Sequence, residues 1–105
     1  MTAIHGRMLA AAMILAAAAP ALGAEVDRRQ ANQQARIADG VRSGQLTPGE
    51  TARLEHHEAR IRHEIRRDRA ANGGTLTPAE RARVNRQEDR TSRQIYRAKH
   101  NDRQM

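Results

Sequence analysis

The feature that most constrains the fold is an internal repeat with a period of 30 residues. Residues 44–67 and 74–97 align without a gap, and 11 of their 24 positions are identical. Each copy opens on the pattern Gly-x-Leu-Thr-Pro-x-Glu. Similarity at a fixed period is typical of repeated structural units, so we expect the two segments to adopt the same local structure.

The opening pattern of each copy is a helix start. The threonine supplies an N-cap hydroxyl, the proline behind it suits the first helical position, and the glutamate three residues after the threonine completes a capping box. The leucine before the threonine is placed for a hydrophobic staple. The residues predicted to fill these structural roles are Leu46, Thr47, Pro48 and Glu50 in the first copy and Leu76, Thr77, Pro78 and Glu80 in the second.

These signals predict an all-α fold of three helices, at about 26–43, 48–71 and 78–101. The connections are short Gly-Leu-Thr-Pro turns, and the glycines in them should end the preceding helices in a left-handed conformation. Because short connections favour helices that fold back on their neighbours, we expect a small bundle.

The predicted core is thin, because the apolar residues form only narrow stripes at helical spacing. The stripe residues are Ala31, Ala35, Ile37, Ala38 and Val41 in the first helix, Leu54, Ile61 and Ile65 in the second, and Val84, Thr91, Ile95 and Ala98 in the third. Glu58 and Glu88 interrupt two stripes at the same repeat position, and the many arginines nearby predict structural ion pairs for them. A homodimer that pools the stripes would enlarge so small a core.

The N-terminus has the parts of a secretory signal peptide. Arg7 precedes an apolar run at 8–19, a proline ends the run, and small residues at 21–24 suit cleavage. The run is shorter than the roughly 20 residues that cross a bilayer. We therefore expect a signal peptide at 1–24, a single small helical domain at 25–105 with no transmembrane segment after cleavage, and a periplasmic or secreted protein.

Composition limits the chemistry of the chain, which contains no Cys, Trp or Phe and a single Tyr. The lack of Cys excludes disulfides, thiolate metal sites and thiol catalysis. With one aromatic residue, a base-stacking platform is not expected, so no specific nucleic-acid partner is predicted. No hydroxyl residue has a partnering base in the sequence pattern. No catalytic residue is therefore predicted, and the chain is not expected to be an enzyme.

Arginine dominates the charged residues: residues 25–105 carry 17 Arg and one Lys against 12 Asp and Glu, which gives a net charge of +6. The repeat places arginines seven residues apart, on one face of each helix. The two predicted rows are Arg53, Arg60 and Arg67, and Arg83, Arg90 and Arg97. Arginine binds phosphate and carboxylate bidentately, so the rows are candidate sites for anionic surfaces or unfolded periplasmic proteins. The alternative is a solvated face with local ion pairs such as Asp89–Arg93.

The turn before the second helix resembles a degenerate EF-hand calcium loop. Counted from Asp39 at the first position, Ser43 falls at the fifth and Glu50 at the twelfth. Val41 stands at the third position, where the loop needs an oxygen ligand, and an arginine takes the first position in the second copy. Divalent-metal binding through the three oxygen-bearing residues is an alternative function, and no other cofactor is predicted. The three histidines of the second helix are predicted to be surface residues.

Residues 46–50 and 76–80, which both read Leu-Thr-Pro-x-Glu, resemble the twice-occurring Leu-Thr-x-x-Gln motif of Spy/CpxP-type periplasmic proteins. The members of that family are helical, cradle-shaped dimers that act as stress-induced chaperones, regulators or metal-responsive proteins, and the resemblance implies such a role. This chain departs from the family in its final Glu and in the close spacing of the two motifs. Residues 95–100, Ile-Tyr-Arg-Ala-Lys-His, are also similar to the ending of small exported proteobacterial proteins without an assigned function.

Three hypotheses follow from the sequence. The first is an exported, non-enzymatic binding or chaperone-like stress protein that uses its arginine-rich helical surface on anionic or unfolded partners. The second is an EF-hand-like sensor or buffer for calcium or another divalent metal. The third is a structural envelope protein whose helices complete their core on a partner.

Overall fold

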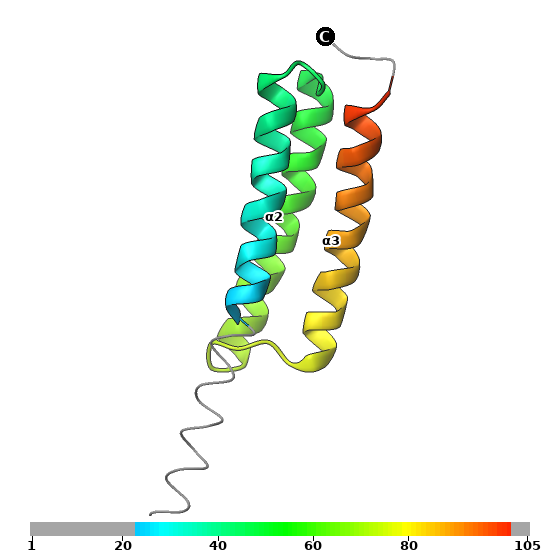
Figure 1. The fold of residues 1–105 in the computed structure, drawn as a ribbon. Coiled ribbons are helices and arrows are strands. Elements are labelled where there is room, and N and C mark those ends of the chain that lie inside the picture. The colour runs from blue at the N-terminus through cyan, green and yellow to red at the C-terminus, as the bar shows by residue number, and fades with distance from the viewer. Residues whose placement is uncertain (1–22, 102–105) are drawn as a thin grey trace, which may run out of the picture.

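The computed structural model describes residues 23–101, which form three helices joined by short turns, with no strand among them. The first helix covers residues 23–42, α2 spans Pro48–Ala71 and α3 spans Pro78–Lys99. The helices lie side by side and alternate in direction (Figure 1). The all-α prediction is therefore confirmed, although α3 ends two residues earlier than predicted. Most of the predicted signal peptide, residues 1–22, lies outside the described residues.

Both helix starts are capping boxes, as predicted. At α2, the hydroxyl of Thr47 accepts a hydrogen bond from the backbone N–H of Glu50 at 3.1 Å, and the Glu50 carboxylate accepts one from the N–H of Thr47 at 3.0 Å. At α3, Thr77 and Glu80 exchange the same two bonds at 3.1 and 2.8 Å. The leucine before each threonine is buried. The two repeat copies thus build the same local structure.

Loss of one cap should measurably weaken the bundle. We expect Thr77→Ala to lower the free energy of unfolding by about 1 kcal/mol, because the amide of Glu80 loses its hydroxyl acceptor. Thr77→Ser keeps the hydroxyl and should stay close to the parent chain. Chemical denaturation followed by circular dichroism measures both, and equal stabilities for the alanine and serine variants would contradict the capping role.

Glycines end the first helix and α2, as predicted. Gly44 (φ 75°), Gly73 (φ 66°) and Gly74 (φ 98°) all occupy the left-handed region, which costs glycine little. The turn after the first helix also needs close packing at Gly40, since a Cβ there would lie 2.6 Å from the buried side chain of Leu46. The N–H of Leu46 donates to the carbonyl of Gly40 at 3.0 Å, which fixes this close approach.

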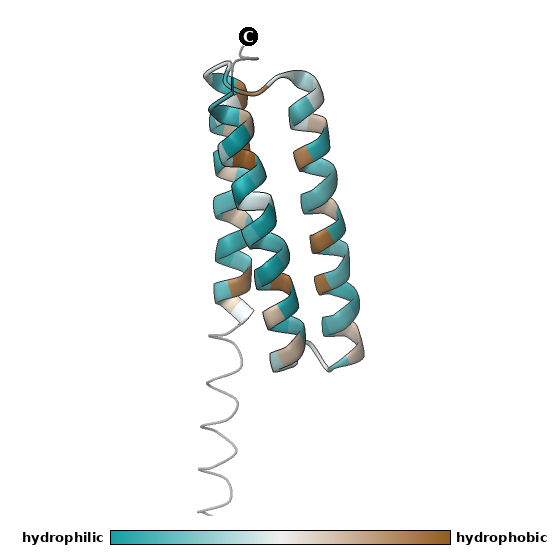
Figure 2. Cartoon of the chain, turned by 90° about the vertical axis from the view of Figure 1, so that its right-hand side faces the viewer, coloured by the Kyte–Doolittle hydropathy of each residue, from teal (hydrophilic) through white to brown (hydrophobic). Residues whose placement is uncertain are grey.

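The apolar core is split into two clusters. One contains Val26, Ile61, Ile65, Leu76 and Val84, and the other contains Ile37, Leu46, Leu54 and Ile95, with Ala98 packed against it. Figure 2 shows how narrow the apolar stripe of each helix is against a largely hydrophilic surface. Within residues 23–101, none of the helices has the length and apolar character that a membrane span requires.

The predicted stripe of the first helix is mostly wrong. Its three alanines are exposed, and Val41 is 50 % exposed. Ile37 is buried as predicted, and the other residues of this helix that are buried are Val26, Gln33 and Gly40. These positions are seven, four and three residues apart, which places them on one face of the helix. A hydropathy pattern does not predict this face, because Gln33 is polar and Gly40 has no side chain.

Ion pairs between exposed or partly exposed side chains connect all three helices. Arg29 of the first helix pairs with Asp89 of α3, Arg69 of α2 pairs with Asp27 at 3.0 Å, and Arg83 of α3 pairs with two carboxylates of α2. The hydrogen bond from Arg29 lowers the pKa of Asp89. Asp89 therefore forms its ion pair with Arg29 of the first helix, and not the local pair with Arg93 that was the alternative prediction. Such surface pairs fix orientation more than they add stability.

Candidate anion-binding groove between α2 and α3

The two arginine rows meet along one groove. A hollow of about 510 Å³ lies between α2 and α3, and a second of about 340 Å³ continues it toward the start of α2 and the end of α3. The two hollows share His57 and Gln94 in their walls, so they adjoin end to end, and together they are called the groove below. Its walls come from α2, α3 and Asn101, and the first helix contributes none of them.

Five of the six predicted arginines line this groove. They are Arg53, Arg60 and Arg67 of α2 and Arg90 and Arg97 of α3, and all five are exposed. In the described part of the chain, none of the five forms an ion pair with a carboxylate. Their guanidinium groups are therefore available to an anionic ligand.

The sixth arginine of the rows, Arg83, does not line the groove. It is held by Glu64 at 2.7 Å and by Asp68 at 2.9 Å, both on α2. At the other end of the groove, the corresponding repeat positions are Gln94 and Ala98, which carry no charge. Glu64 and Asp68 thus neutralise Arg83, whereas Arg53, its equivalent in the first copy, meets no carboxylate from the corresponding positions.

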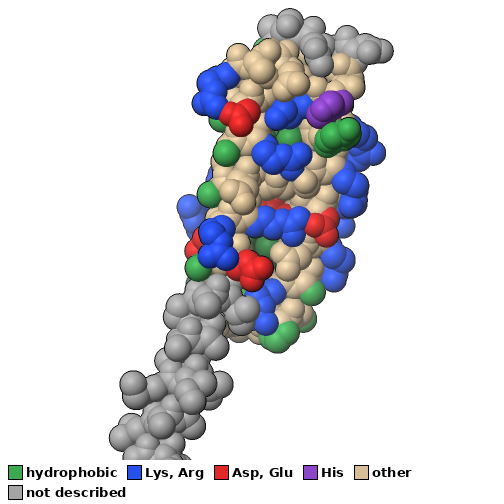
Figure 3. All heavy atoms as spheres, viewed as in Figure 1, with side chains coloured by type: hydrophobic (Ala, Val, Ile, Leu, Met, Phe, Trp, Pro, Cys, Tyr) green, Lys and Arg blue, Asp and Glu red, His purple; other side chains and the backbone are tan. Residues whose placement is uncertain are grey.

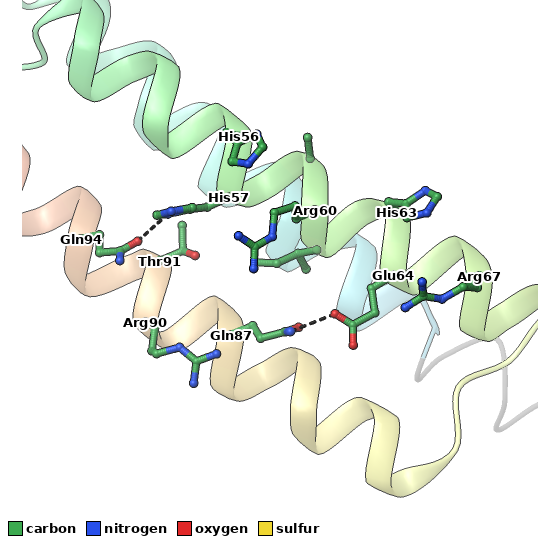
Figure 4. A pocket seen from close by; sticks show the side chains of 12 residues that line it. His56, His57, Arg60, His63, Glu64, Arg67, Gln87, Arg90, Thr91 and Gln94 are labelled. Atoms are coloured by element: carbon green, nitrogen blue, oxygen red, sulfur yellow. Dashed lines mark hydrogen bonds between the residues drawn. The ribbon is translucent and has the colours of Figure 1, made fainter.

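Two hydrogen bonds between helices hold the walls together. Nδ1 of His57 donates to Oε1 of Gln94 at 2.9 Å, and Nε2 of Gln87 donates to Oε2 of Glu64 at 2.9 Å. Figure 4 shows Arg60 reaching from α2 toward α3 between these two bonds. Because positions 57 and 87 are equivalent in the repeat, as are 64 and 94, the two bonds are related by an approximate two-fold symmetry. Sequence reasoning did not identify Gln87 and Gln94 as site residues.

The same symmetry brings two glutamates together in the core behind the groove. Glu58 is 0 % exposed and Glu88 is 1 % exposed. Nε2 of Gln30 donates to Glu88 at 3.0 Å and to Glu58 at 3.5 Å. Within residues 23–101 neither glutamate forms an ion pair, so the predicted arginine pairing is wrong. These residues, with Gln33 and Thr91, add a buried polar group to the core.

The burial of Glu58 strongly changes its acidity. Desolvation raises the pKa of its carboxyl from 4.5 to about 9, and a hydrogen bond with Glu88 and repulsion by its charge act in the same direction. One oxygen of each carboxyl, Oε2 of Glu58 and Oε1 of Glu88, is buried without another hydrogen-bond partner. A proton on Glu58 lets its carboxyl donate a hydrogen bond to that of Glu88. Because its pKa is about 9, Glu58 is protonated at neutral pH.

The three residues of the EF-hand-like loop are engaged in other contacts. Asp39 pairs with Arg42, and the hydroxyl of Ser43 donates to the carbonyl of Gly40 at 3.3 Å. Glu50 caps α2 with one oxygen, and its other oxygen accepts from Asn101 at 2.8 Å. Among residues 23–101 there is no group of three His, Asp or Glu side chains that could hold a metal, the groove histidines included. Metal binding by this loop stays a prediction.

A third hollow, also of about 340 Å³, lies on another face, between the first helix and α3. It is lined by Arg36, Ser92, Arg93, Tyr96 and Arg97. Tyr96 is 58 % exposed, and its ring stacks on that of His100 with the centroids 4.1 Å apart. Figure 3 shows basic side chains along the length of the face of the molecule seen in Figure 1, with few acidic ones between them. Positive charge therefore occurs over much of the surface, and in the groove between α2 and α3 arginines line a concave surface.

No known protein family, curated protein or solved structure matches this chain. The resemblance to the Spy/CpxP-type proteins therefore stays a prediction that rests on the two Leu-Thr-Pro-x-Glu motifs.

Proposed function

We propose that this chain is an exported, non-enzymatic binding protein that holds an anionic partner in the groove between α2 and α3. The observation that carries the proposal is that five exposed arginines from two helices line two adjoining hollows between these helices. Five guanidinium groups on two facing walls can contact a ligand from both sides. Arginine suits this role because its planar fork forms paired hydrogen bonds with carboxylate or phosphate oxygens.

An anionic partner fits this surface better than an apolar one. Among residues 23–101, the large hydrophobic side chains that are exposed are Val41 and Tyr96. A protein that captures the apolar segments of unfolded chains needs a larger apolar patch. Unfolded partners would therefore bind through acidic segments, by the same contacts that serve other anionic partners.

Charge reversal in the groove tests the proposal. We expect the double substitution Arg60→Glu and Arg90→Glu to weaken binding of poly-glutamate by at least ~10-fold at low salt, because it replaces central attraction with repulsion. The matched control is Arg66→Glu with Arg86→Glu, which makes the same change in net charge on the same two helices. Arg66 and Arg86 are exposed and lie outside the groove walls.

Fluorescence anisotropy with labelled poly-glutamate measures the affinities of the full chain and of both variants. The proposal predicts a much larger loss for the groove variant than for the control, and weaker binding for all three proteins as salt is added. Equal losses in the two variants would mean that the net charge of the chain, and not the groove, holds the ligand. Circular dichroism of each variant confirms that its helices are retained.

A further inference from the structure

We propose that the ligand of the groove is a strand of acidic polysaccharide in which charged sugar units alternate with neutral ones. This inference rests on the proposed function and names its substrate class. It follows from the order of the side chains along the groove.

Positions with arginine and positions without it alternate along the groove. Arg53 and Arg97 line one end, followed by the neutral pair His57 and Gln94, and then by Arg60 and Arg90. Beyond them lie Gln87 and Glu64, which are joined by a hydrogen bond, and then Arg67. Glu64 pairs with Arg83, which also pairs with Asp68. Glu50 lines the groove beside Arg53 and Arg97. The groove thus offers three positions with arginine, separated by two positions where polar side chains are hydrogen-bonded to each other across the groove.

The spacing of these positions is regular. The arginines of α2 recur every seven residues, which corresponds to about 10.5 Å along a helix axis and about 21 Å from Arg53 to Arg67. Two sugar rings of an extended glycan cover nearly the same interval. A glycan with one carboxylate on every second sugar would therefore meet an arginine position with each charge, and its neutral, hydroxyl-rich sugars would face the amide and imidazole groups between them.

Other polyanions match this pattern less well. Polyphosphate carries a charge on every unit, so many of its charges would face the positions without arginine. A membrane surface is flat and would contact the rims of the groove before its walls. A single small anion would contact one arginine position and leave the others unused.

Hyaluronan oligosaccharides provide the probe, because glucuronate alternates with neutral N-acetylglucosamine along their chain. We expect the affinity of the full chain to rise by at least ~10-fold from the disaccharide to the hexasaccharide, which carries three charges, and then to change little. Arg53→Gln should weaken binding of the hexasaccharide and leave that of the disaccharide nearly unchanged, because it removes one terminal position. Arg66→Gln is the matched control and should change neither.

Isothermal titration with the oligosaccharides, polyphosphate, poly-glutamate and phosphatidylglycerol vesicles separates the outcomes. Hexasaccharide binding that is tighter than binding of polyphosphate or poly-glutamate of equal charge supports the inference. Tighter binding of either of these polyanions or of the vesicles overturns it but leaves the proposed function standing. An affinity that does not depend on oligosaccharide length also overturns it. If none of the anionic probes binds, both the inference and the proposed function fail.

Discussion

The chain is expected to become more stable as the pH falls from about 9 toward 4.5, and Glu58→Gln is expected to remove most of this dependence. The folded chain holds a proton on Glu58 up to a pKa of about 9, whereas the unfolded chain releases it near 4.5. Between these values the folded state binds more protons, so the free energy of unfolding decreases as the pH rises. One such proton corresponds to about 1.4 kcal/mol per pH unit.

The surroundings of Glu58 explain the direction of this effect. Glu88 of α3 faces it with a second carboxyl, and Gln30 of the first helix contributes a neutral amide. On α2 itself, the charge of Arg62 lowers the pKa of Glu58, and the charge of Glu55 raises it. The loss of water around the fully buried carboxyl outweighs the effect of Arg62, so the pKa of Glu58 stays raised.

Thermal melts across this pH range test the prediction. Glu58→Gln keeps the shape of a protonated glutamate and can still donate a hydrogen bond to Glu88, so its melting temperature should be higher than that of the parent chain at pH 8. Glu55→Gln, on the same helix and partly exposed, is the control and should retain the parental pH dependence. Parallel melting curves for the parent chain and Glu58→Gln at every pH would show that the carboxyl pair does not hold a proton.

Ile95→Ala is expected to be the most damaging single substitution in the core. Ile95 is 0 % exposed and belongs to the apolar cluster that joins the first helix, α2 and α3. Removing its buried side chain should cost about 2–5 kcal/mol, a large part of the stability of a domain this small. We expect its melting temperature to fall by on the order of 10–20 °C.

Val41→Ala provides the comparison, since Val41 is 50 % exposed and lies outside both apolar clusters. Its melting temperature should change by only a few degrees. Differential scanning calorimetry of both variants gives the two differences under the same conditions. If Ile95→Ala melts cooperatively at nearly the parental temperature, then the second apolar cluster does not stabilise the fold.

Much of the fold could be predicted because its signals are local. The capping boxes depend on residues no more than four positions apart, and the repeat shows each of them twice. The left-handed glycines after the first helix and α2 follow from the same short segments. These features fixed the helix count and the bounds of α2 without any knowledge of how the helices pack.

The buried face of the first helix and the contact between the two glutamates were not predicted, since both depend on packing. Gln33 and Gly40 face the bundle even though neither is strongly apolar, and the more apolar alanines face solvent. Glu58 and Glu88 occupy equivalent repeat positions, and in two antiparallel copies equivalent positions near the middle must meet. The repeat therefore indicated a contact between the two glutamates, but the many arginines nearby favoured the prediction of ion pairs.

The arginine rows illustrate the same limit at the candidate site. Their seven-residue spacing placed each row on one face of a helix, but the rotation of α2 against α3 decides whether the rows converge. Capture of Arg83 by Glu64 and Asp68 depends on contacts between positions 15 and 19 residues apart, which no local pattern indicates.

The central claim is that the groove between α2 and α3 binds anions, and backbone chemical-shift mapping tests it most directly. Poly-glutamate is titrated into the ¹⁵N-labelled full chain, and the amide resonances are followed. We predict that the largest shifts map to the groove walls, around Arg53, Arg60, Arg67 and Arg90. Shifts centred on Arg36 and Tyr96, on the other face, or spread evenly over all exposed arginines would contradict the claim.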